Sequence, residues 1–148
     1  MAHPSNARSI IGSASTEIRQ AIHITENQAM DFGVLVMSNG NGDTLSLSPD
    51  GSITNTNGNV SPIGNTQYAV FSASGTPNTP LSISFQNGSL TGNSNTITLH
   101  NFNHNAGTSP TFNNSGTLTF HVGADLEVNA NQETGSYSGN YQVTINYQ

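Results

Sequence analysis

Few side chains in this sequence could carry acid–base chemistry, and their spacing forms no known catalytic pattern. The eight acidic residues are scattered, and only Asp125 and Glu127 lie two apart in a segment with strand periodicity. Alternate residues of a strand share one face, which suits a solvated sheet surface as well as a carboxylate pair. No Gly-x-Ser-x-Gly motif marks a nucleophilic serine. We therefore expect no catalytic residue, and we expect that the protein is not an enzyme.

Two patterns could bind metal. His100 and His104 lie four apart, which would join them on a helix but separates them by about 13 Å along a strand. Asn39 to Asp43, with Asp50 at the twelfth position, resembles a calcium loop, although Thr44 stands where that loop needs glycine. Loop histidines and a plain hairpin loop are the alternatives. The sequence leaves both patterns open, and we expect neither a metal nor a cofactor.

The basic residues exclude several classes of function. The chain has no Lys, its only Arg residues are Arg8 and Arg19, and its formal net charge is -6. Nucleic-acid binders need cations against phosphate, and a P-loop or a Schiff-base enzyme needs Lys. The absence of Cys excludes disulfides and thiolate metal sites but leaves the compartment undecided.

No apolar run approaches the ~20 residues that a membrane-spanning helix needs, so we expect no membrane span. Met1 to Pro4 does not open a signal peptide. If the protein is exported, we expect that its signal has been removed.

Alternation of apolar and polar residues predicts strands throughout the chain. The clearest segments are Leu81 to Phe85, Thr117 to Val122 and Tyr141 to Tyr147. Further candidates with the same period are Ala21 to Thr25, Phe32 to Met37, Thr44 to Ser48, Tyr68 to Ala73, Thr96 to Phe102 and Asp125 to Val128. Asn-Gly pairs at 39–40, 41–42, 57–58 and 87–88 favour tight turns, and Asp50-Gly51 reads as a hairpin tip. With eight or nine short strands and no helical stripe, we expect an all-β protein, an immunoglobulin-like sandwich of two sheets.

Three glycine motifs are expected to support this fold. Gly135, Tyr137 and Gly139 surround a turn before the strongest strand, where the apolar residues are Val143, Ile145 and Tyr147. This arrangement predicts a corner in which the tyrosine hydroxyl is anchored to backbone. Phe32-Gly33 and Val122-Gly123 each predict a core residue followed by a bulge or a close backbone approach.

The N-terminal segment has strand periodicity before the domain begins. Residues 1–19 are predicted to be an extension and residues 20–148 a sandwich domain, whose edges lack the Lys residues that usually block strand addition. One face of the extension carries Ile10, Gly12, Ala14, Thr16 and Ile18. A shift by one residue would turn Arg19 inward, so this face is the better donor row. A disordered tail, or a first strand paired within its own chain, is the alternative.

Several landmarks resemble a known family. They are Ala21 to Ile24, Met30 to Gly33, Ser48 to Gly51, Phe71 to Gly75, Phe120 to Val128, Asn131-Gln132, Gly135 to Gly139 and Val143 to Tyr147. In this order they resemble domain-of-unknown-function family 4402 over about residues 21–148. That family consists of exported bacterial proteins and is similar in pattern to spore-coat protein U and chaperone-usher pilin domains.

The resemblance implies a structural role at the cell surface. Such relatives are incomplete sandwiches that polymerise when the N-terminal strand of one subunit fills the groove of the next. We therefore expect a secreted, pilin-like subunit of a fimbria or surface filament whose partners are copies of itself, with the need for an assembly chaperone left open. The alternative is a monomeric adhesin or carbohydrate-binding module.

Overall fold

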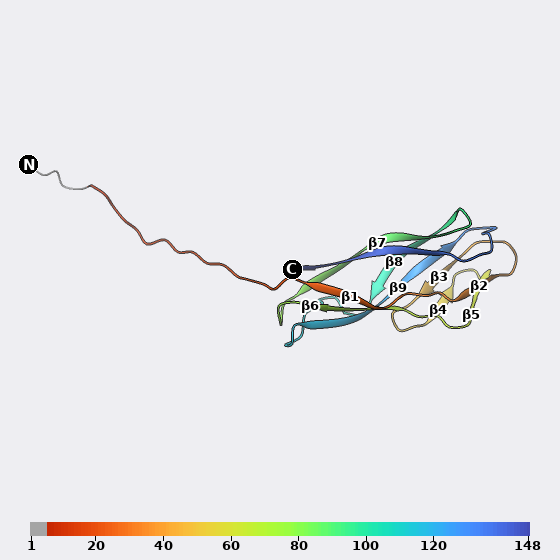
Figure 1. Cartoon of the computed structure of the whole chain (residues 1–148), viewed down its shortest axis with the longest axis horizontal. Coiled ribbons are helices and arrows are strands. Elements are labelled where there is room, and N and C mark those ends of the chain that lie inside the picture. Colours follow the sequence, from red (N-terminus) through yellow and green to blue (C-terminus); the bar gives the residue numbers. More distant parts are fainter. Residues whose placement is uncertain (1–5) are drawn as a thin grey trace, which may run out of the picture.

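The chain folds into β-strands alone, as the sequence predicts. The computed structural model describes residues 6–148, and in this range it contains ten strands and no helix (Figure 1). The strands are β1 (His23–Gln28), β2 (Val34–Met37), β3 (Asp43–Leu47), β4 (Ile53–Asn55), β5 (Val60–Ile63), β6 (Ala69–Ser74), β7 (Leu81–Gly92), β8 (Asn95–His104), β9 (Thr117–Val128) and β10 (Ser138–Tyr147). Among these residues no helix is long and apolar enough to cross a membrane.

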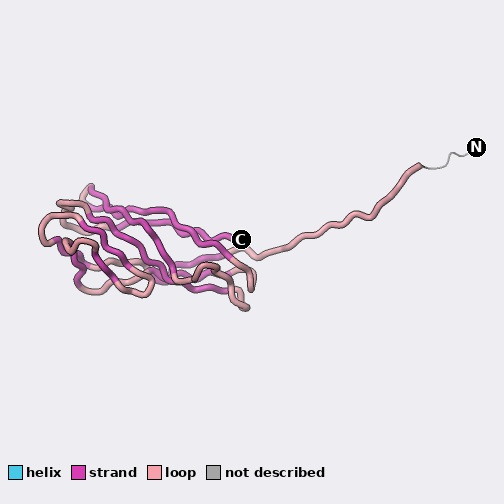
Figure 2. Tube along the Cα trace, turned by 180° about the vertical axis from the view of Figure 1, so that it is seen from behind, coloured by secondary structure: helices cyan, strands magenta, loops and turns pink. Residues whose placement is uncertain are grey.

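Eight of the strands form one curled antiparallel sheet, seen from behind in Figure 2. Its order is β1-β6-β9-β8-β7-β10, and β3 pairs with the second half of β9 and with β4. The other two strands, β2 and β5, form a small antiparallel sheet. The two strands at the ends of the long path, β1 and β10, each have one partner within residues 6–148.

Positive backbone angles mark two of the hairpin turns. Gly51 has φ 94° at the tip between β3 and β4, and its N–H donates to the carbonyl of Ser48 over 2.9 Å, which confirms that predicted hairpin. The β7–β8 hairpin turns at Asn93 and Ser94, both with positive φ, as a two-residue turn of the primed type requires.

The sequence prediction was wrong at three places. Asn87-Gly88 is not a turn but lies inside β7, where two residues oppose Tyr141 of β10 in a β-bulge. The segments expected at 117–122 and 125–128 form the single strand β9. Strand β5 was missed because it contains Pro62, which an edge strand with one partner tolerates.

The core lies between the faces of the curled sheet. Its largest fully buried side chains are Phe112, Phe120, Leu45, Leu47, Leu81, Leu126, Val60 and Val122. The prediction for Val122-Gly123 is confirmed, since Val122 is buried and a Cβ on Gly123 would collide with the carbonyl of Leu47. This approach lets β3 pair closely with β9.

Residues 6–22 form no strand and leave the domain as an extended tail (Figure 1). Ile10, Ile11 and Ile18 are 95%, 97% and 88% exposed, so the tail up to Ile18 buries almost none of its apolar surface on its own domain, whereas Ile22 at its end packs against the core. The expected alternative of a first strand paired within its own chain is therefore wrong for these residues. The rest of the predicted extension, residues 1–5, lies outside the described residues.

Candidate functional site

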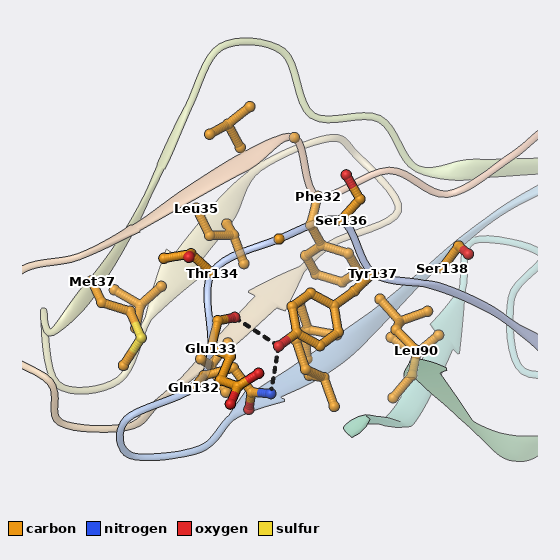
Figure 3. A pocket seen from close by; sticks show the side chains of 18 of the residues that line it. Phe32, Leu35, Met37, Leu90, Gln132, Glu133, Thr134, Ser136, Tyr137 and Ser138 are labelled. Atoms are coloured by element: carbon orange, nitrogen blue, oxygen red, sulfur yellow. Dashed lines mark hydrogen bonds between the residues drawn. The ribbon is translucent and has the colours of Figure 1, made fainter. Parts of the chain in front are cut away.

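A long groove opens at the end of the domain away from the termini. Its volume is about 1130 Å³, and Figure 3 shows it between strand β2 on one side and the segment before β10 on the other. Leu35 and Met37 of β2 face Tyr137 across this space, and Leu90 of β7 lies beside Tyr137. The floor is apolar and includes Ile97, Leu99 and Leu126.

Two strand edges flank the groove. Within residues 6–148, β2 pairs with β5 alone and β10 pairs with β7 alone. Each strand therefore presents a row of backbone N–H and C=O groups that has no partner strand. Such an edge can take up an additional strand by backbone hydrogen bonding.

The apolar side chains along β10, from the groove to the opposite end of the strand, are incompletely covered. Tyr141, Val143, Ile145 and Tyr147 of β10 all contact the core, yet none of them is fully buried. The same holds for the side chains that face them or lie near them in the core, namely Met30, Ile83, Phe85, Phe102 and Leu118. Half-buried apolar rows of this length leave an area that another apolar strand could cover.

A tyrosine corner shapes the far end of the groove. The hydroxyl of Tyr137 donates to the carbonyl of Glu133 over 2.7 Å and accepts from Nε2 of Gln132 at 3.1 Å (Figure 3). This is the backbone anchor that the sequence predicts for this residue. Gly135 turns the same segment at a positive φ of 146°. The corner holds the segment that becomes the β10 side of the groove.

Phe32 and Gly33 position strand β2. Phe32 is buried, and Gly33 has φ 73° with its absent Cβ only 2.7 Å from the carbonyl oxygen of Asn65. A side chain would be both strained and obstructed here, so the predicted close approach is confirmed. The backbone N–H of Gly33 also donates to Oδ1 of Asp31.

Asp43 ties the small sheet to the large one. Its Oδ1 accepts backbone N–H bonds from Thr44, Thr56 and Asn57, at 2.9, 3.1 and 2.9 Å. Its Oδ2 accepts from Asn59 and Val60 at 2.8 and 3.1 Å. Burial raises the pKa of Asp43, but the backbone hydrogen bonds outweigh burial and leave it below its usual value.

Tyr141 lies where two core clusters meet beside the groove. Its ring packs against Phe102 at 4.9 Å between centroids and meets Phe71 edge-on at 6.4 Å. Its hydroxyl is enclosed and makes no hydrogen bond within residues 6–148. Burial, with a smaller effect from the charge of Glu26, raises the pKa of Tyr141 well above its ordinary value.

The predicted donor row lies outside the groove of its own domain. Ile10, Gly12, Ala14, Thr16 and Ile18 are all exposed, and a Cβ on Gly12 would meet no atom within 4 Å. The root of the tail, residues 19–22, is in contrast fixed beside the end of β10. There the hydroxyl of Tyr147 donates to the carbonyl of Gln20 over 2.6 Å.

The candidate metal ligands have separate surroundings. Nε2 of His100 lies 3.3 Å from Oε2 of Glu127, whereas Nδ1 of His104 accepts the N–H of Ala106. Asp50 accepts from Ser52 within its own turn. In the part of the chain that the structure describes, no three His, Asp or Glu residues are grouped as metal ligands would be.

Asn39 does not join Asp43 in a calcium loop. Its Oδ1 accepts the N–H of Asn41 at 3.1 Å, and both carboxylate oxygens of Asp43 are occupied by backbone donors. The segment is a turn stabilised by local hydrogen bonds.

Sequence reasoning missed most of the groove. Leu35, Met37 and Leu90 belong to predicted or partly predicted strands, but no local signal shows that they face an uncovered space. The signal that was available is the period of the last strand, which put Tyr141 and its alternate neighbours on one face.

Comparison with known proteins identifies a matching family model. The family model described as Domain of unknown function (DUF4402) matches residues 22–147, nearly the same part as the landmarks in the sequence. No curated protein matches the chain, and no solved structure does.

Proposed function

This chain belongs to the family Domain of unknown function (DUF4402), and we propose that it is the structural subunit of an extracellular, pilin-like filament. In this proposal the tail of one subunit enters the groove of the next by donor-strand complementation. The incoming strand closes the curled sheet and the small sheet into an immunoglobulin-like sandwich of two sheets. The filament is a head-to-tail homopolymer at the cell surface, where it could also serve adhesion.

The observation that carries the proposal is that one chain contains both an uncovered groove and an extended tail whose apolar side chains are uncovered. The groove has two free edges, and half-buried apolar side chains continue from it along β10. The tail has exposed Ile residues on an extended backbone that leaves the domain (Figure 1). Each feature on its own favours association with another chain, because open strand edges and exposed apolar segments both bind other polypeptides.

The lengths agree. Strand β10 has ten residues, and residues 10–19 in extended conformation span about 33 Å at ~3.3 Å per residue, the length of such a strand. Ile10 and Ile18 at the ends of the donor row can therefore reach opposite ends of the unpaired edge of β10.

The ends of the domain favour one direction of insertion. The tail leaves beside Tyr147, at the C-terminal end of β10 (Figure 1). If a neighbour's tail runs antiparallel to β10, its residue 19 lies near Ser138, and the neighbour's domain lies beyond the other end of the receiver. Domains then follow one another without overlap. Such a heterologous contact does not close and builds a fibre.

Peptide complementation tests the proposal. Within residues 6–148 no fully buried apolar residue precedes Phe32, and the partly buried Ile22 and Met30 follow Gln20, so a chain that begins at Gln20 keeps the described core. We expect a peptide of residues 6–19 to bind this truncated protein and to raise its melting temperature. A matched peptide with Ile10→Asp and Ile18→Asp should not. Equal effects of both peptides, or no effect of either, would contradict the proposal.

A further inference from the structure

A tail that can fill a neighbour's groove could also fill its own, and the second event has an advantage in concentration. Tethering gives the tail an effective concentration in the millimolar range at its own groove, far above the concentration of free subunits. The inference below rests on the proposed function and concerns the contacts that direct the tail to a second copy.

Self-insertion would require the chain to reverse direction at the root of the tail. Five antiparallel pairings lead from β1 to β10, so these two strands run in opposite directions. To lie on its own β10 the tail would have to form a hairpin with β1, and it would then run parallel to β10, opposite to the direction proposed for a neighbour's tail. The turn would fall on Gln20, Ala21 and Ile22, between Arg19 and His23, and none of these is the Gly, Asn, Asp or Pro that tight turns favour.

A cluster of hydrogen bonds around Tyr147 holds the same segment in an extended conformation. The Tyr147 hydroxyl donates to the carbonyl of Gln20 at 2.6 Å and accepts the N–H of Thr76 at 2.8 Å. The N–H of Gln20 donates to Oγ1 of Thr76 at 2.7 Å. Both backbone groups of Gln20 are thereby fixed in the conformation that directs the tail away from the domain.

Arg19 makes two further contacts that hold the root of the tail against the domain. Its Cζ lies 5.1 Å from the centroid of the Tyr147 ring, and its Nη1 donates to the carbonyl of Gln148 at 3.3 Å. Gly75 makes room for the Tyr147 hydroxyl, since a Cβ there would lie 2.5 Å from it. The last strand of the groove thus also fastens the root of the tail.

From this geometry we propose that Tyr147 is a positioning residue that keeps the tail out of its own groove and so selects a second copy of the chain as the acceptor. The Tyr147 hydroxyl holds Gln20 extended. A reversal at Gln20 would break the bonds to Tyr147 and Thr76 before any strand pairing could form.

The test follows the tail in folded monomers. Wild-type protein, Tyr147→Phe and the control Tyr68→Phe, which alters a ring stacked on His121 instead of the root, are refolded from denaturant at low concentration. Monomers are isolated by size exclusion, and hydrogen exchange of residues 9–19 is measured by mass spectrometry. A tail inserted in its own groove exchanges slowly, whereas a free tail exchanges at once.

We expect fast exchange in wild type and in Tyr68→Phe. In Tyr147→Phe we expect about tenfold more monomer with a protected tail, which corresponds to about 1.4 kcal/mol, and a matching loss of polymer. The double variant Gln20→Asn, Ala21→Gly supplies a turn sequence and should act in the same direction if Tyr147→Phe folds poorly.

Equal, fast exchange in all of these variants would overturn the role of Tyr147, as would a wild-type monomer whose tail is already protected. Polymer formation by wild type is scored separately at high concentration. Its absence would contradict the proposed function, whereas the role of Tyr147 is judged from exchange in the monomer.

Discussion

Oδ2 of Asp43 accepts the backbone N–H of Val60 at 3.1 Å, and this bond joins the first residue of β3 to the first residue of β5. Strand β5 is the only partner of β2 within residues 6–148, and β2 forms one side of the groove. A buried carboxylate therefore holds the small sheet in the place where an incoming strand would meet it.

Replacing Asp43 by Asn should destabilise the domain by roughly 3 kcal/mol, because an amide nitrogen would face N–H donors that the carboxylate now satisfies. Unfolding in guanidinium measures this change. Asp50→Asn is the matched control, since Asp50 is solvated and bonds only within its own turn. Equal losses in the two variants would contradict the role of Asp43.

The stabilisation by Asp43 should depend on pH. The pKa of Asp43 is lower in the folded protein than its ordinary value of 3.8, so its contribution is present above about pH 4. It is lost as the pH falls through the lower, folded pKa. The difference in unfolding free energy between wild type and Asp43→Asn should therefore shrink in strong acid. A difference that stays constant from pH 6 to about pH 2 would refute this expectation.

His104 should contribute a second pH dependence of stability. Burial lowers the pKa of His104 below its ordinary value of 6.5, and its Nδ1 accepts the N–H of Ala106, which requires an unprotonated nitrogen. Stability should fall as the pH drops below about 6.5, because the unfolded chain then binds the proton more readily. His104→Asn keeps an acceptor that cannot titrate, and thermal unfolding between pH 7 and about pH 5 should show a smaller slope for it. An unchanged slope would contradict this account, and His23→Asn on exposed β1 is the control.

The two faces of the tail should differ in their effect on assembly. Ile10 and Ile11 are equally exposed in the subunit, so changing either to Asp should leave the melting temperature of the monomer unchanged. Ile10 belongs to the proposed donor row and Ile11 to the opposite face. Light scattering should show that Ile10→Asp abolishes assembly and that Ile11→Asp reduces it far less. The reverse order would mean that the odd-numbered face enters the groove.

Local periodicity was enough to predict most strands, because alternate burial acts on each strand separately. Thr44 to Ser48 was predicted one residue away from β3, and Tyr141 to Tyr147 was found inside β10. The glycine predictions at Gly33, Gly51 and Gly123 also held, since positive φ and close approach are properties of short segments.

Contacts between residues far apart in the sequence could not be predicted from local periodicity. The bulge at Asn87-Gly88 exists because Gly88 approaches the backbone of Asn140 on a strand more than fifty residues later, which local turn preference cannot show. The groove is likewise a consequence of which edges remain unpaired. The five backbone bonds to Asp43 come from residues 44 to 60 and need the folded loop to become visible.

Electron microscopy of negatively stained protein tests the central claim most directly, with the full-length chain compared with a version that begins at Gln20. The account predicts filaments from the full-length protein and monomers from the truncated one, because the tail is the strand that joins neighbours. Filaments from the truncated protein, or monomers from both at high concentration, would contradict it.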